Sequence, residues 1–177
     1  MKIWKLEYDV NNYEAFIPEA GLFAIDDFDG TSQKEGWQPM KMVPADPKEH
    51  LPFGDAAYLT TPMYSRRALE VLLPLMGDSV EILPMLCDEG DYSAVNVIDV
   101  IDAIDYEKSK FERFKCSGRI MCFDKYAFVP EKVAGKHIFK IVDHPKSNSF
   151  VSDEFMQVVE KNGLTGFKSE LVWDSEA

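Results

Sequence analysis

Two segments with the same pattern constrain the fold of this chain more than any other feature. In each, a serine precedes apolar residues at helical spacing, over 65–73 and again over 152–160. A serine in that place caps a helix, because its side-chain oxygen accepts a hydrogen bond from the backbone of the first turn. A strand is predicted after each helix, over 80–84 and over 167–173. We therefore expect at least two amphipathic helices packed on a sheet.

An offset of 87 residues superimposes these two units. It aligns Ser65 with Ser152 and Leu72 with Val159, so that the cap and the apolar face coincide. Each unit consists of a cap, a helix, a turn and a strand. Because a capped helix before a strand is a common arrangement, two explanations stay open: a duplication, and two independent uses of one unit.

Most of the remaining chain has the short-range patterns of β-strands. Residues 11–57 are divided by proline and glycine, so we predict loops there, with short strands at 22–25 and 37–43. Asp124-Lys125 is predicted to be the turn of a hairpin. The strands predicted elsewhere cover 3–8, 92–101, 119–123, 126–129 and 137–142.

These elements predict an α+β fold, mainly antiparallel sheet with at least two amphipathic helices and, on the first explanation, two copies of the cap–helix–turn–strand unit. We expect a single domain over 1–177, with a loop-rich N-terminal part at 1–57. A chain of this length can bury a core without disulfides. The predicted core residues are Leu69, Leu72, Val80, Ile82, Val95, Val97, Ile138, Phe139, Ile141, Phe155, Val159 and Phe167.

The formal net charge of −12 narrows the classes of partner. A nucleic-acid-binding protein carries a basic patch to neutralise phosphates, and adhesion to anionic lipid also needs basic residues. We therefore expect neither nucleic acid nor membrane as a partner. A hydrophobic content of 46% is too high for a disordered acidic chain.

The sequence contains no recognisable catalytic or metal-binding motif. It lacks a nucleophile elbow, a phosphate-binding glycine loop and a zinc-binding helix motif. The three cysteines form no close pair, and the three histidines lie in predicted turns or at a strand start. We expect no catalytic residue, no metal and no cofactor, and free thiols in a reducing cytoplasm.

Two groups of acidic residues are the remaining candidates for a functional surface. Asp26, Asp27 and Asp29 lie beside Gly30, but the ligand positions of a calcium loop fail there, so a solvated turn is favoured. Asp99, Asp102 and Asp105 are spaced by three. This second group could form the carboxylate site of a small enzyme or, more simply, a solvated face or a set of turn caps.

Several segments in the C-terminal two thirds of the chain, taken in order, resemble immunity protein family eleven of bacterial polymorphic toxin systems. The resemblance covers roughly residues 58–173. The segments that carry it are 64–68, 80–84, 97–105 with 107–109, 138–141, 150–152, 162–166 and 172–173. The recurring residues of that family, placed on this chain, are Ser65, Pro84, Asp102, Asp105, Ser109, Ser152, Gly163, Gly166 and Trp173.

The resemblance implies a non-enzymatic cytoplasmic protein that binds and neutralises a cognate bacterial toxin. An acidic inhibitor suits a basic toxin, because complementary fields speed association. Two other functions stay open: a small enzyme with the carboxylate site described above, and a ligand-binding or self-associating module that forms a homo-oligomer. The candidate partner-binding residues are Asp26, Asp27, Asp29, Asp99, Asp102 and Asp105.

Overall fold

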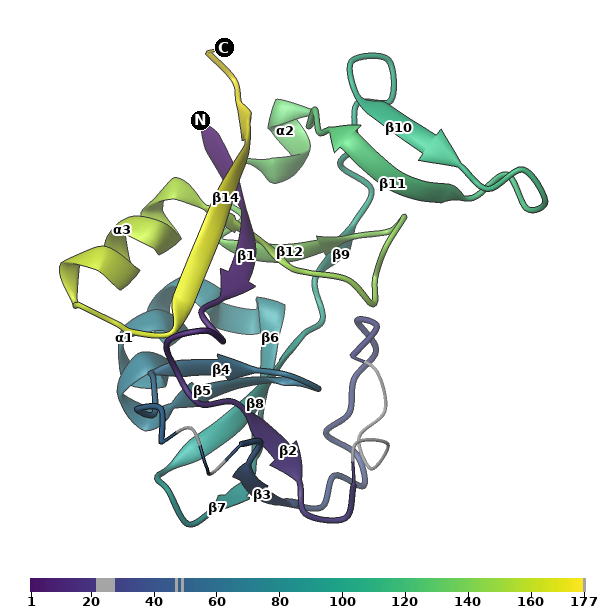
Figure 1. The fold of residues 1–177 in the computed structure, drawn as a ribbon. Helices are drawn as coiled ribbons and strands as arrows, with labels where there is room; N and C mark the ends of the chain where they lie inside the picture. The colour runs from purple at the N-terminus through teal and green to yellow at the C-terminus, as the bar shows by residue number, and fades with distance from the viewer. Residues whose placement is uncertain (22–27, 47, 49, 177) are drawn as a thin grey trace.

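The computed structural model describes residues 1–21, 28–46, 48 and 50–176, and its strands form two larger sheets and two small ones (Figure 1). The first larger sheet has the order β4 (Ala56–Tyr58), β5 (Pro62–Ser65), β8 (Tyr92–Val97) and β6 (Val80–Pro84). The second has the order β14 (Phe167–Asp174), β1 (Lys2–Tyr8), β13 (Phe150–Ser152), β12 (Ile138–Ile141) and β9 (Val100–Ile101). Nearly all pairs are antiparallel, so the predicted α+β class with a mainly antiparallel sheet is confirmed.

The two small sheets are separate from the two larger ones. One joins β2 (Phe16–Pro18), β3 (Lys41–Pro44) and β7 (Leu86–Cys87), and the other is a hairpin of β10 (Lys110–Arg113) and β11 (Ile120–Lys125). The helices are α1 (Arg66–Met76), α2 (Pro130–Val133) and α3 (Asp153–Lys161), with a single 3-10 turn, η1 (Gly77–Ser79), after α1.

The two serines cap the helices as predicted. The Ser65 side chain accepts a hydrogen bond from the backbone N–H of Ala68, and the Ser152 side chain accepts one from Phe155. These bonds satisfy backbone donors that the first turn of a helix leaves without a partner. Acidic residues begin α3, where they favour the positive end of the helix dipole.

The correspondence between the two units extends beyond cap and helix to the sheet order. In the first sheet α1 joins β5 to β6, which lie on either side of β8; in the second α3 joins β13 to β14, which lie on either side of β1. The neighbours on the outer side correspond too, since β4 pairs with β5 and β12 pairs with β13. This shared order favours duplication over two independent uses of one unit.

One large core joins the two units, and a further cluster lies against each. The first cluster consists of residues of α1, α3 and both larger sheets, including Leu72, Val95 and Phe155. A second lies between the first sheet and the β2–β3–β7 sheet, and a third lies between the second sheet and residues 103–133. Ten of the twelve predicted core residues are buried; Ile82 and Phe167 are half-buried and pack against the first cluster.

The strand predicted over 92–101 is two strands. β8 ends at Val97, the backbone N–H groups of Ile98 and Asp99 both donate to the Ser79 carbonyl, and the chain then enters the second sheet as β9, parallel to β12. The β-branched residues of the segment 92–101 thus belong to both larger sheets, and the spacing of apolar residues alone does not show this division.

The hairpin predicted around Asp124-Lys125 is wrong. β11 pairs with β10, and within 126–129 Phe128 makes an isolated bridge to Ile104. The reason is burial. The Phe128 side chain is 2% exposed and its ring contacts four other rings in and around the third cluster, which draws this segment into the core. Part of the strand predicted over 37–43 is present as β3, whereas the one over 22–25 falls outside the described residues.

Candidate partner-binding surface

The first group of predicted contact acids is described only in part. Asp26 and Asp27 lie outside the described residues. The Asp29 carboxylate accepts hydrogen bonds from the backbone N–H of Thr31 at 3.0 Å and from its hydroxyl at 2.7 Å. These bonds lower the pKa of Asp29 and close a tight turn. The side chain is therefore ionised and ordered within a solvent-facing loop.

The second group does not form a common carboxylate site. Residues 98–105 run in an extended path, and each aspartate faces a different lysine. The hydrogen bond and charge of Lys108 lower the pKa of Asp105, which also accepts bonds from the backbone of its own turn. The ion pairs are Asp99–Lys136 at 2.7 Å, Asp102–Lys132 at 3.3 Å and Asp105–Lys108 at 3.1 Å.

Glu81 is a buried acid that the sequence analysis did not single out. It is 3% exposed on β6, and it accepts hydrogen bonds from the Ser32 hydroxyl, the Gln33 backbone N–H and the Asn96 side chain. Burial alone would raise its pKa, but these bonds outweigh burial and lower the pKa of Glu81. Glu81 thereby fixes the 31–33 loop to the first sheet.

We expect acid to release part of this stabilisation. Because the folded-state pKa of Glu81 lies below its unfolded value of about 4.3, the ionised carboxylate stabilises the fold above that pH, and the contribution disappears as pH falls through the folded pKa. Urea melts of wild type and Glu81→Gln at neutral pH and near pH 3 measure this difference. The variant should lose less stability than wild type on acidification; equal losses would contradict the assignment.

A projecting hairpin is the most distinctive surface feature of the described residues (Figure 1). We call residues 106–125, which include β10 and β11, the arm. Its strands pair with each other and with no other strand in the described part of the chain. Residues 112–119, at the far end, are all exposed.

The root of the arm is anchored to the segment that directly follows it and to the turn after β12. The Ser109 hydroxyl donates to the Ala127 carbonyl and accepts from the Ala127 N–H, and the Phe123 ring stacks on Tyr126 at 4.7 Å. The Tyr106 hydroxyl donates to Asp143. Partial burial and this carboxylate raise the pKa of Tyr106 to about 12, so it stays a neutral donor near neutral pH.

A recess of about 270 Å³ lies beneath the arm. Met121 and Phe123 line it from the arm, and Tyr126, His144 and Phe150 line it from the body of the protein. We call this recess the hollow. The His144 ring contacts the Phe123 ring edge-on, and its Nε2 lies 3.1 Å from the Ile120 carbonyl oxygen. The hollow is open to solvent, and Lys5, Ser147 and Asn148 line it beside the aromatic rings, so it offers both polar and apolar contacts.

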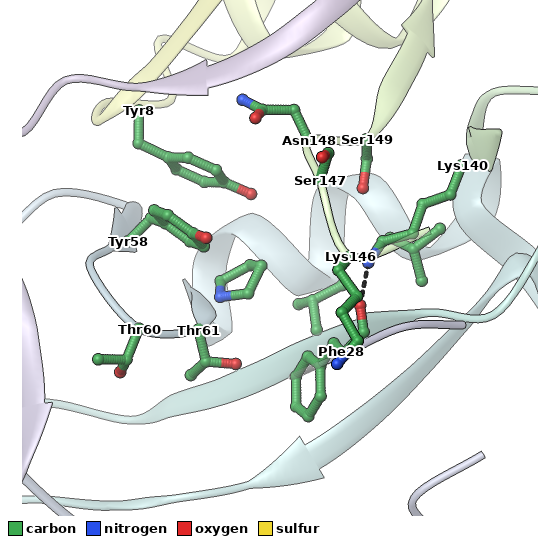
Figure 2. A pocket seen from close by; sticks show the side chains of 13 residues that line it. Tyr8, Phe28, Tyr58, Thr60, Thr61, Lys140, Lys146, Ser147, Asn148 and Ser149 are labelled. Carbon is green, nitrogen blue, oxygen red and sulfur yellow. Dashed lines mark hydrogen bonds between the residues drawn. The ribbon is translucent and has the colours of Figure 1, made fainter. Parts of the chain in front are cut away.

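A second cavity lies where the two larger sheets meet, and Figure 2 shows its lining. Tyr8 stacks on Tyr58 at 5.1 Å on one side. Lys140, which is 5% exposed, donates from Nζ to the carbonyl oxygens of Phe28 and Pro145. The volume is about 60 Å³, enough for a few water molecules. This cavity is therefore a polar joint between the units and too small for a substrate pocket.

A local concentration of basic residues could have indicated the arm from the sequence, although a search for motifs does not use composition in this way. Six of the chain's 19 Lys and Arg residues fall within 106–125, in an otherwise acidic protein. Among the described residues, no group of three or more His, Cys, Asp or Glu side chains gathers to hold a metal. No helix among them is long and apolar enough to cross a bilayer.

A comparison with models of protein families identifies one family that matches part of this chain. The sequence model of an immunity protein family, Imm11, matches residues 88–172, which is 85 of the 177 residues. The match confirms the resemblance over that stretch, and residues 58–87, which the resemblance also included, lie outside it. The matched stretch contains the arm, α3 and all the residues that line the hollow except Lys5. No curated protein matches the chain.

Proposed function

We propose that this chain is a non-enzymatic immunity protein that binds a cognate toxin and neutralises it in the cytoplasm of the cell that makes both. The observation that carries the proposal is the immunity-family match over residues 88–172. The four acidic candidates that the structure describes also support it, because their carboxylates are held by separate lysines and turns and are not brought together for acid–base chemistry.

Charge supports the kind of contact proposed. With a net charge of −12, the chain attracts a basic partner and speeds its approach. We propose that the six acidic candidates contribute to this attraction. Asp29 and Asp102 are the best placed among the described members, because Asp29 faces solvent in a loop and the Asp102 side chain is 62% exposed.

Co-expression tests the function directly. The toxin-domain protein encoded beside this chain should arrest growth when it is expressed alone, and co-expression of this chain should restore growth. A pull-down should recover the complex, and its Kd should rise at least about tenfold between about 50 and 500 mM salt if opposite charges drive association. Unrelieved growth arrest together with an empty pull-down contradicts the proposal; a salt-independent Kd contradicts the electrostatic part.

Two variants separate a specific acidic contact from overall charge. Asp29→Lys with Asp102→Lys should weaken binding by about tenfold if these acids meet the toxin. Glu70→Lys with Glu154→Lys changes the net charge equally at exposed helix positions and is the control. If the two pairs of substitutions changed the Kd equally, Asp29 and Asp102 would contribute only through long-range attraction and not through a specific contact.

A further inference from the structure

Charge is strongly segregated between the arm and the rest of the chain. The arm has six basic and three acidic residues, a net charge of +3, whereas the other residues have 13 basic and 28 acidic, a net charge of −15. The basic side chains are distributed along the arm, at Lys108, Lys110, Arg113, Lys115, Arg119 and Lys125. Positive charge is therefore concentrated on a hairpin that projects from an otherwise acidic body (Figure 1).

The arm also exposes large apolar side chains among these charges. Phe114 is 44% exposed, Met121 is 42% exposed and Tyr106 is 41% exposed. The Arg113 guanidinium lies 4.8 Å from the centroid of the Phe111 ring, which holds it against the hairpin. Arginine, aromatic residues and methionine are the side chains enriched at protein–protein interfaces.

The far end of the arm contributes little to the core. A two-stranded hairpin is marginally stable on its own, and this one is ordered at its root by Ser109, Tyr106 and Phe123. Beyond the root, Arg113 donates to the Gly118 carbonyl and the Phe114 N–H donates to the Arg119 carbonyl, so the turn is closed by its own bonds. The end is thus preformed, which lowers the entropic cost of binding.

We propose that the arm is a docking element that enters an acidic, partly apolar groove of the toxin, while the hollow receives one apolar side chain from that toxin. This inference rests on the proposed function and names the contacting element. The charge of +3 selects the acidic groove, and the exposed apolar residues of the arm with the aromatic rings on one part of the hollow supply the apolar contacts. A second copy of the chain is the competing occupant, because the residues outside the arm carry a net charge of −15, and the labelling experiment below distinguishes it from the toxin.

Charge reversal at the end of the arm is the first test. Lys115→Glu with Arg119→Glu changes the arm from +3 to −1 at exposed positions and should weaken toxin binding by about 30-fold or more. Lys34→Glu with Lys161→Glu changes the overall charge equally at exposed positions outside the arm. This control should bind like wild type or slightly more tightly, because the added negative charge strengthens the long-range attraction of a basic partner. A control as weak as the arm variant would overturn the proposal.

Truncation of apolar side chains is the second test. Met121→Ala should weaken toxin binding by about tenfold, because the side chain lines the hollow and faces the partner. Leu73→Ala, at an apolar residue that is 38% exposed on α1, should leave the Kd within about twofold. Both variants should melt near wild type, which separates loss of contact from loss of fold.

A chemical footprint gives a readout independent of affinity. Cys116 is exposed at the tip, whereas Cys87 and Cys122 are partly buried. In a Cys87→Ala and Cys122→Ala background, bound toxin should slow maleimide labelling of Cys116 by about tenfold or more. Toxin that binds without slowing the labelling overturns the arm proposal and leaves the proposed function standing, whereas wild type that binds no toxin removes both.

Two other partners are distinguishable in the same experiments. Slowed labelling of Cys116 with no toxin present, together with a dimer or larger species in sedimentation, would assign the arm to a second copy. Binding of a fluorescent single-stranded oligonucleotide that Lys115→Glu with Arg119→Glu abolishes would assign the arm to nucleic acid. Each of these results overturns the proposal.

Discussion

Phe155→Ala should destabilise the protein by about 3–5 kcal/mol. The side chain is 0% exposed and lies in the first core cluster, which both helices and both larger sheets share. Its ring contacts the half-buried Phe167 ring at 6.3 Å, so truncation leaves a cavity at the junction of α3 and β14. Urea denaturation at neutral pH measures the loss as a lower midpoint with an unchanged slope.

Leu73→Ala is the matched control for this prediction. Leu73 lies on α1 and is 38% exposed, so its truncation should cost less than about 1 kcal/mol. A loss below about 1 kcal/mol for Phe155→Ala would mean that α3 presents another face to the core. A large loss for both variants would point instead to a general sensitivity of the two helices.

Asp55→Ala should cost about 3 kcal/mol, because one buried carboxylate connects the two units. Asp55 is 7% exposed and immediately precedes β4. It accepts hydrogen bonds from the Ser65 hydroxyl at 2.9 Å, from Arg67 at 2.8 Å, and from the Thr165 backbone N–H and hydroxyl at 2.9 and 3.1 Å. Removal of the carboxylate leaves these donors without their acceptor at the start of α1 and at the turn after α3.

The conservative variant and an exposed pair on the same helix complete this test. Asp55→Asn keeps an acceptor for Ser65 but loses the charge that faces Arg67, so we expect about half the loss of Asp55→Ala. Glu70→Ala breaks an exposed ion pair with Arg66 and should cost less than about 0.5 kcal/mol. If Asp55→Ala melts like Glu70→Ala, the carboxylate does not hold the units together.

The candidate surface could be predicted from the sequence less well than the fold. The spacing of Asp99, Asp102 and Asp105 left a common carboxylate site open beside the simpler solvated face or turn caps, and the structure pairs each of them with a different lysine. Their partners Lys132 and Lys136 follow the arm in the chain, and only folding brings them back. The wrong hairpin prediction paired residues 119–123 with 126–129 and so separated them from residues 106–118. For that reason the basic residues of the arm did not stand out as one group.

Local patterns determined the elements whose energetics are local. A serine cap, an apolar stripe and the turn that ends the helix act within about ten residues, so α1, α3 and most core positions could be predicted, whereas the short α2 was not. The 87-residue offset and the immunity-family resemblance are also properties of the sequence alone, and the shared strand order and the match over 88–172 support them.

Only the tertiary structure decided which sheet each strand joins and which side chains meet. Residues 92–101 divide between two sheets, β1 supplies to the second sheet the strand that β8 supplies to the first, and Phe128 enters the core at the expense of a hairpin. The physical reason is that burial and strand pairing depend on partners far away in sequence, whereas caps and periodicity do not.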